Sequence, residues 1–124
     1  MLLGVCLGTR DLTRAGRFYD AVLAHVGLTR SFENDSEIGY GPPDGPRCFW
    51  VLTPFDGRPA TWGNGTQVTF RADSRAAVDA FHRTTLEHGG TDEGAPGPRS
   101  YRPGYYGAYC RDPDGNKLHV MHDG

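Results

Sequence analysis

The chain repeats itself, and this repeat limits the possible folds more than any other feature of the sequence. The turn-like run around Asp44-Gly45 aligns with the run around Asp114-Gly115 at an offset of 70 residues. Independently, the apolar residues around Leu23 recur around Leu86 at an offset of 63 residues. Two helices and two turn-strand units at nearly constant offsets predict two copies of one β-α-β-β-β module.

The second copy ends in a predicted β-hairpin. Pro113 presets one φ at about −65°, and Asp114-Gly115 supplies the positive φ of a tight turn. We therefore expect residues 109–111 and 117–121 to pair as antiparallel strands. Because side chains alternate along a strand, one face of the second strand should pack in the core and the other should point away from the core. The core face carries Leu118 and Val120, and the opposite face carries Lys117, His119 and Met121.

Each copy contains one predicted amphipathic helix. Asp11 is a suitable N-cap for a helix over residues 12–26, and Gly27 follows as a stop. Ser74 opens the second helix, which Gly89-Gly90 ends. Short apolar runs predict strands at about residues 1–8, 29–33, 37–40, 47–53, 66–72 and 90–94, with a loop over residues 96–104.

Length and charge indicate a single compact domain. A chain of 124 residues is enough for one core, and its net charge of −2 with scattered basic residues disfavours nucleic-acid binding. No apolar run is long enough for a membrane span, and no basic segment precedes the first apolar run. We expect a cytoplasmic domain over residues 1–124, with module one at about 1–53, a linker at about 54–64 and module two at about 65–124.

The three cysteines lie in predicted strands. Cys6, Cys48 and Cys110 are odd in number and lack CxxC spacing. This pattern favours buried free thiols over disulfides, metal ligation or catalysis.

Three motifs carry a resemblance to a known family. They are Asp11-Leu12 with Phe18-Tyr19-Asp20, the run Ala77-Val78-Asp79-Ala80-Phe81, and Asp112-Pro113-Asp114-Gly115-Asn116. With these motifs in this order, the chain resembles members of the vicinal oxygen chelate superfamily, which includes glyoxalase I, bleomycin-resistance proteins and extradiol dioxygenases. The resemblance implies an α+β fold in which two βαβββ modules form a curved mixed sheet around a ligand cup, with the helices on the outer face. In the enzymes of that superfamily the cup holds a divalent metal.

By this resemblance, the family's metal-ligand positions fall on Gly4, Phe49, Gln67 and His119. Glycine has no ligating side chain and phenylalanine has no lone pair, so these four positions do not supply enough ligands to coordinate a divalent metal. We therefore expect no cofactor, with a divalent metal as the alternative. For His119, three roles stay open: a hydrogen-bonded histidine in the cup, a ligand-binding group and a metal ligand. It is also the best catalytic candidate.

Strand alternation predicts which side chains enter the cup. Opposite the core residues Val68 and Phe70, it places Gln67, Thr69 and Arg71 in the cup. The same reasoning adds Cys6, Arg47, Phe49, Lys117, His119 and Met121. The predicted ligand-binding residues are Phe49, Gln67, Thr69, Arg71, Tyr105, Tyr106 and His119, with Trp50 in the aromatic wall. The cations must reach the rim, find carboxylates or meet an anionic ligand, because unpaired buried charge is costly.

The sequence leaves two functions open. The first is a metal-independent small-molecule-binding or resistance-type protein whose ligand is anionic or aromatic. The second is a glyoxalase- or lyase-type enzyme in which His119 is a general base or one ligand of a rearranged metal site. Edge strands and the linker also predict a homodimer, with modules paired within one chain or across the dimer.

Overall fold

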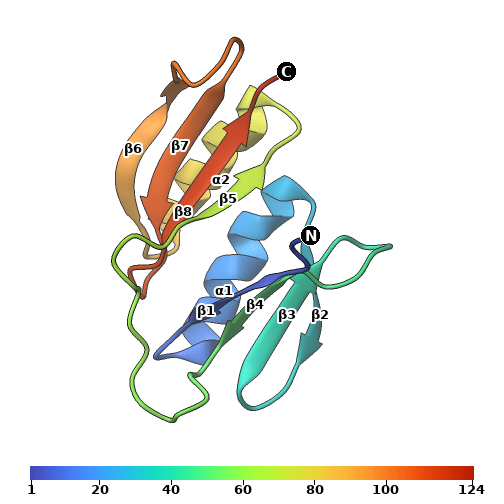
Figure 1. The fold of residues 1–124 in the computed structure, drawn as a ribbon, viewed down its shortest axis with the longest axis vertical. Coiled ribbons are helices and arrows are strands. Elements are labelled where there is room, and N and C mark those ends of the chain that lie inside the picture. Colours follow the sequence, from blue (N-terminus) through green and yellow to red (C-terminus); the bar gives the residue numbers. More distant parts are fainter.

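The computed structural model describes residues 1–124 and contains two successive βαβββ modules (Figure 1). The first module comprises β1 (Val5–Gly8), α1 (Leu12–Leu23), a 3₁₀ turn (Ala24–Val26), β2 (Thr29–Glu33), β3 (Glu37–Gly41) and β4 (Phe49–Leu52). The second comprises β5 (Val68–Arg71), α2 (Arg75–Glu87), β6 (Thr91–Pro98), β7 (Tyr106–Arg111) and β8 (Lys117–His122). The predicted fold class is therefore confirmed.

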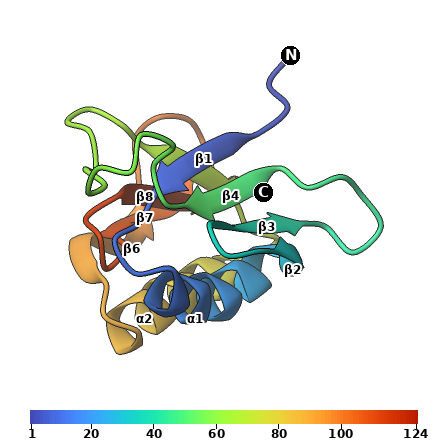
Figure 2. The same cartoon turned by 90° about the horizontal axis from the view of Figure 1, so that it is seen from below.

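The strands form two four-stranded sheets, and both helices lie on the same side of them (Figure 2). The strand orders are β1-β4-β3-β2 and β5-β8-β7-β6, so the two modules have the same topology. In each sheet the first strand pairs in parallel with the last, and the other pairs are antiparallel. The other face of each sheet, called here the open face, carries no helix. No helix has the length and apolar character needed to cross a bilayer.

Both predicted helix caps are present. The Asp11 side chain accepts a hydrogen bond from the Arg14 backbone N–H at 3.0 Å, and Ser74 Oγ accepts one from the Ala77 N–H at 3.0 Å. Gly27 ends the first helical segment with a φ of 78°, a conformation that favours glycine.

Two predicted boundaries were wrong. β1 begins at Val5 rather than at the first residue, and β6 extends to Pro98 into the predicted loop. β6 is an edge strand that tolerates Pro98, and its register shifts twice, between Asp92 and Gly94 and between Gly94 and Gly97. These irregularities remove the alternating pattern by which a strand is recognised in sequence.

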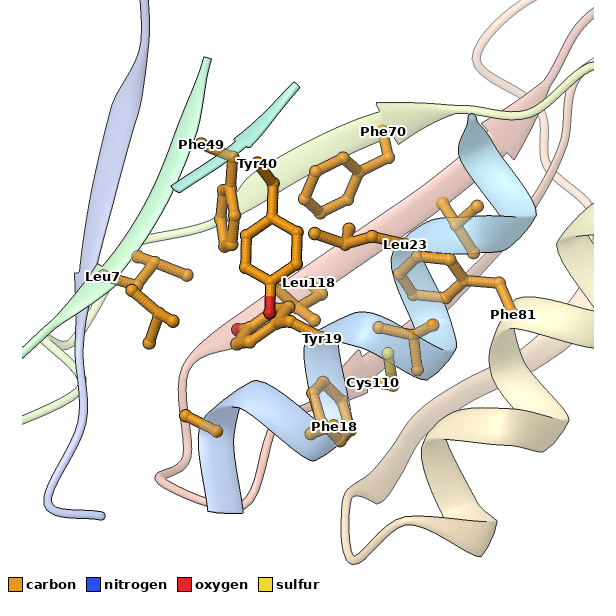
Figure 3. Packing of buried hydrophobic residues seen from close by; sticks show 14 of the residues in the cluster. Leu7, Phe18, Tyr19, Leu23, Tyr40, Phe49, Phe70, Phe81, Cys110 and Leu118 are labelled. Atoms are coloured by element: carbon orange, nitrogen blue, oxygen red, sulfur yellow. The ribbon is translucent and has the colours of Figure 1, made fainter. Parts of the chain in front are cut away.

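One hydrophobic cluster of 18 buried residues, drawn from both modules, fills the space between the sheets and the helices (Figure 3). Phe49 lies within it, with its ring centroid 4.9 Å from that of Tyr19 and 5.6 Å from that of Phe70. The predicted placement of Phe49 on the cup face is therefore wrong. β1 pairs Val5 with Phe49 and Cys6 with Trp50, so Trp50, not Phe49, shares a face with Cys6.

The cysteine prediction holds only in part. All three thiols are free, but Cys110 alone is buried, whereas Cys48 is half-buried and Cys6 is exposed. Cys6 is exposed because its strand parity places it on the open face.

The hairpin between β7 and β8 forms with the predicted pairing, Arg111 opposite Lys117. Gly115 has a φ of 93°, but Asp114 does not share the positive φ that we expected. The turn also contacts module one, because Asp114 accepts hydrogen bonds from the Thr9 hydroxyl at 2.6 Å and from the Arg14 guanidinium at 2.8 Å. Module two is thus tied to module one through polar contacts as well as through the core.

Candidate functional site

Four aromatic side chains gather on the open face of the second sheet. We call Tyr101, Tyr105, Tyr109 and His119 the aromatic array. Tyr109 and His119 are cross-strand neighbours whose rings stack with centroids 4.0 Å apart and planes 14° apart. Tyr105 lies nearly parallel to the His119 ring at 5.9 Å, and Tyr101 meets Tyr105 edge-on at 5.0 Å. The Tyr101 and Tyr109 hydroxyls are hydrogen-bonded at 2.6 Å.

The hydrogen bonds of His119 identify its tautomer. Nδ1 lies 2.8 Å from the Ala108 carbonyl oxygen, which can only accept, so Nδ1 carries the proton. Nε2 therefore accepts a hydrogen bond from the Tyr105 hydroxyl at 2.6 Å. Burial lowers the pKa of His119, and the nearby positive charges of Arg99 and Lys117 act in the same direction. His119 is thus a neutral imidazole whose lone pair is already engaged.

Glycines on two strands make room for these rings. A Cβ atom added at Gly107 would approach His119 Cε1 to 2.7 Å, and one at Gly94 would approach Tyr109 Cδ2 to 3.2 Å. The alternation of Tyr105, which directly precedes β7, with Gly107 and Tyr109 on β7 is the pattern that could have revealed the array from sequence. Our sequence reasoning missed Tyr101 and Tyr109.

Several cations surround the array. Arg99 Cζ lies 5.7 Å and Lys117 Nζ 5.2 Å from the centroid of Tyr109, and Arg102 Cζ lies 5.3 Å from that of Tyr105. Arg71 and Arg102 both bind the carboxylate of Asp123, whose pKa they lower. We expected each cation of the cup to reach the rim, pair with a carboxylate or meet an anionic ligand. Arg71 pairs with a carboxylate, that of Asp123.

A pocket of about 410 Å³ lies between the two modules. Its wall is mainly apolar, and the polar side chains Gln67 and Thr69 lie on its β5 side, with Gln67 Nε2 3.4 Å from Thr69 Oγ1. Apolar residues of both modules line it, among them Val5, Leu28, Phe49, Val68 and Phe70.

Three of the four family metal positions meet at this pocket. Gly4, Phe49 and Gln67 all line it, while His119 pairs with the lining residue Thr69 across β5 and β8. Together they offer one amide and one imidazole whose two nitrogens are both hydrogen-bonded. No group of three or more His, Cys, Asp or Glu side chains could hold a metal ion. The residues present do not fit a divalent centre, which usually takes about three protein ligands.

Other predicted site residues are divided between the two faces. Tyr106 points to α2, where its hydroxyl donates to Asp79 at 2.6 Å, so its predicted place in the cup is wrong. The cause is strand alternation, which groups Tyr106 with the buried Ala108 and Cys110. Thr69 and Arg71 are exposed on the open face. Their cross-strand partners His119 and Met121 lie on the same face but are buried.

The repeated topology and the motifs can be compared with known proteins. The model of the Glyoxalase/Bleomycin resistance protein/Dioxygenase superfamily matches residues 2–120. The chain belongs to this superfamily. A glyoxalase/bleomycin resistance protein from Albidiferax ferrireducens T118 is 41% identical over 98% of each chain, with a TM-score of 0.88.

More distant structures share the fold alone. A glyoxalase/bleomycin resistance protein/dioxygenase family enzyme from Burkholderia phytofirmans PsJN is 22% identical over 99% of this chain and 98% of its own, with a TM-score of 0.77. Lactoylglutathione lyase from Agrobacterium tumefaciens is 22% identical over 98% and 92%, with a TM-score of 0.68. A comparison with curated proteins found no significant match.

Proposed function

We propose that this protein is a metal-independent small-molecule-binding member of its superfamily, and that its ligand occupies the pocket between the modules. One observation carries the proposal. The family metal positions Gly4, Phe49 and Gln67 meet at an apolar pocket and supply a single amide between them. Sequestering a toxic compound requires binding and no chemistry, so a resistance-type role is compatible with this site.

The pocket wall indicates the character of the ligand. The partly buried residues Val5, Leu28 and Val68 offer apolar surface, and burying an apolar ligand against it contributes about 25 cal/mol per Å². Gln67 and Thr69 can hydrogen-bond one polar group of the ligand at the exposed end. We therefore expect an apolar or aromatic body that carries a hydrogen-bonding group.

A dye titration tests this pocket. N-phenyl-1-naphthylamine is neutral and apolar, and its fluorescence rises when it leaves water. We expect saturable binding to the unmodified protein and a loss of at least tenfold in affinity in Gln67→Trp, whose bulky side chain would fill the pocket mouth. Thr66→Trp is the matched control, because Thr66 is also exposed but does not line the pocket. Absence of saturable binding, or equal affinity in both variants, would overturn the proposal.

The alternative, a glyoxalase- or lyase-type enzyme, depends on a rearranged metal site. Elemental analysis of protein purified without chelators separates it from the first reading. We expect nickel, zinc, iron and manganese far below one atom per chain. Near-unit occupancy by a metal that is lost in His119→Ala would favour the alternative.

A further inference from the structure

We propose that a cavity at the linker binds the phosphate group of a small phosphate monoester through Arg10 and Arg58. This linker cavity has a volume of about 490 Å³ and lies where the linker runs past the ends of β1 and β4 (Figure 1). Thr9 and Arg10 line it from module one, and the linker contributes Pro54, Arg58 and Ala60. None of its lining residues lines the pocket between the modules, so the two sites are separate.

The linker cavity is lined by two positive charges and by no negative one. Arg10 and Arg58 line it, whereas no aspartate or glutamate does. Arg10 Nε donates to the Ala60 carbonyl oxygen at 3.0 Å, while the terminal nitrogens of Arg10 and the whole guanidinium of Arg58 make no hydrogen bond or ion pair. These nitrogens are free to donate to a ligand. Guanidinium groups match the oxygen atoms of a phosphate in charge and geometry.

Two carboxylates close to these arginines in the structure are already engaged. Asp114 accepts the Arg10 backbone N–H at 2.9 Å, but its side chain is 5% exposed and pairs with the Arg14 guanidinium at 2.8 Å. Asp56 accepts the Arg58 backbone N–H at 2.9 Å and lines a neighbouring cavity. Neither carboxylate lines the linker cavity. A phosphate can therefore enter without displacing a carboxylate.

The backbone around the linker cavity is held in place before a ligand arrives. The Gly57 N–H donates to the Pro54 carbonyl oxygen at 3.0 Å, which closes a tight turn. Ala60 is 6% exposed and packs so closely on Gly8 that a Cβ atom added there would lie 2.9 Å from the Ala60 Cβ. Pro54 and Pro59 each fix one φ angle. This order reduces the entropy lost when a ligand binds.

The size of the linker cavity indicates an organic phosphate rather than the inorganic ion alone. Its volume falls within the range of about 300–1,000 Å³ that is typical of small-molecule sites. Two arginines suit the double negative charge of a monoester. The ring carbons of Pro54 and Pro59 offer apolar surface to a short organic group. We therefore expect a monoester with a short aliphatic chain.

Calorimetry and amide NMR with butyl phosphate test this site, with inorganic phosphate as the anion alone and butanol as the uncharged analogue. We expect both phosphates to bind, butyl phosphate severalfold more tightly, and butanol not to bind. Binding should shift the amide signals of Gly57 and Ala60 and leave those of Gly107 and Val120 on the second sheet unchanged. Added salt should weaken binding, because it screens exposed charges.

Arg58→Gln is the decisive variant, because the Arg58 side chain makes no hydrogen bond within the protein and its loss should leave the fold intact. It should weaken butyl phosphate about tenfold through the lost charge-assisted contact. Arg10→Gln should weaken binding as well, but it also removes the contact with Ala60. The matched control is Arg83→Gln, which removes one exposed cation from α2 and should leave the affinity unchanged.

The linker site would be overturned by absence of phosphate binding, by equal affinity for the two phosphates, or by equal losses in Arg58→Gln and Arg83→Gln. Amide shifts confined to the second sheet would also overturn it. The Gln67→Trp variant separates the two proposals, since it should lose the dye from the pocket between the modules and keep its affinity for butyl phosphate. Loss of both ligands in that variant would overturn the assignment of butyl phosphate to the linker cavity.

Discussion

The Tyr19 hydroxyl donates a hydrogen bond of 2.5 Å to Asp112 Oδ2, joining the first helix to the last hairpin turn across 93 residues of sequence. Both side chains are buried. Asp112 Oδ1 also accepts from the backbone N–H groups of Asp114 and Asn116 at 2.9 Å. Burial raises the pKa of Asp112, and the hydrogen bonds from Tyr19 and Asn116 oppose that rise. The Asp112 carboxylate thus stabilises both the conformation of the turn and the contact between the two modules.

Removing the Tyr19 hydroxyl should therefore destabilise the protein. In Tyr19→Phe the buried carboxylate loses one donor, which should lower the free energy of unfolding by about 1–3 kcal/mol. Tyr106→Phe is the matched control, because it removes a hydroxyl that also binds an aspartate but in a less buried setting. Urea unfolding of both variants measures the difference. Equal losses of unfolding free energy would show that the buried Tyr19–Asp112 contact stabilises the protein no more than the Tyr106–Asp79 contact does.

The neighbouring residues Leu118 and His119 should both matter for stability. Leu118→Ala should lower the free energy of unfolding by about 2–5 kcal/mol, because the removed atoms leave a cavity in the core. His119 is also buried, beneath the two tyrosine rings, so His119→Ala should cost about 1–3 kcal/mol through the unpaired Tyr105 hydroxyl and Ala108 carbonyl. Denaturant melts test both. A negligible loss in His119→Ala would mean that the array does not pack as described.

The buried neutral state of His119 predicts a pH dependence. Its folded pKa lies below the ordinary value of 6.5, so the unfolded chain binds more protons between these two values. The contribution of His119 is complete above about pH 6.5 and is lost as the pH falls towards the folded pKa. Urea unfolding of the unmodified protein and of His119→Phe across this range should show a flatter profile in the variant. Nitrogen NMR should report a protonated Nδ1, and a protonated Nε2 at neutral pH would contradict the assigned tautomer.

Assembly is a further prediction. β1 and β5 are edge strands of their sheets, so each presents unpaired backbone groups at the junction of the modules. We predict a homodimer whose interface includes these module-joining strands. Light scattering at micromolar concentration should report about twice the chain mass of 13.6 kDa. A mass of one chain alone would exclude the dimer.

The sequence by itself determined the repeated architecture. The caps at Asp11 and Ser74 and the turn at Gly115 are local signals, because each depends on residues close together in the chain. The offsets of 63 and 70 residues show that such local patterns occur twice. They were sufficient to predict two βαβββ modules and the core position of Leu118. Strand boundaries were less secure where glycine and proline obscured alternation, as in β6.

Only the tertiary structure decided which of the predicted site side chains lie in the core and which lie on the open face. Phe49 belongs to the core because β1 and β4 pair in a register that places it opposite Val5, and that register depends on contacts between distant segments. Likewise, the Nε2 lone pair that a metal would need on His119 accepts a hydrogen bond from Tyr105, which lies 14 residues away, directly before β7. Local patterns specify elements, whereas the contents of a site depend on how those elements pack, since packing alone brings distant donors, acceptors and rings within contact distance.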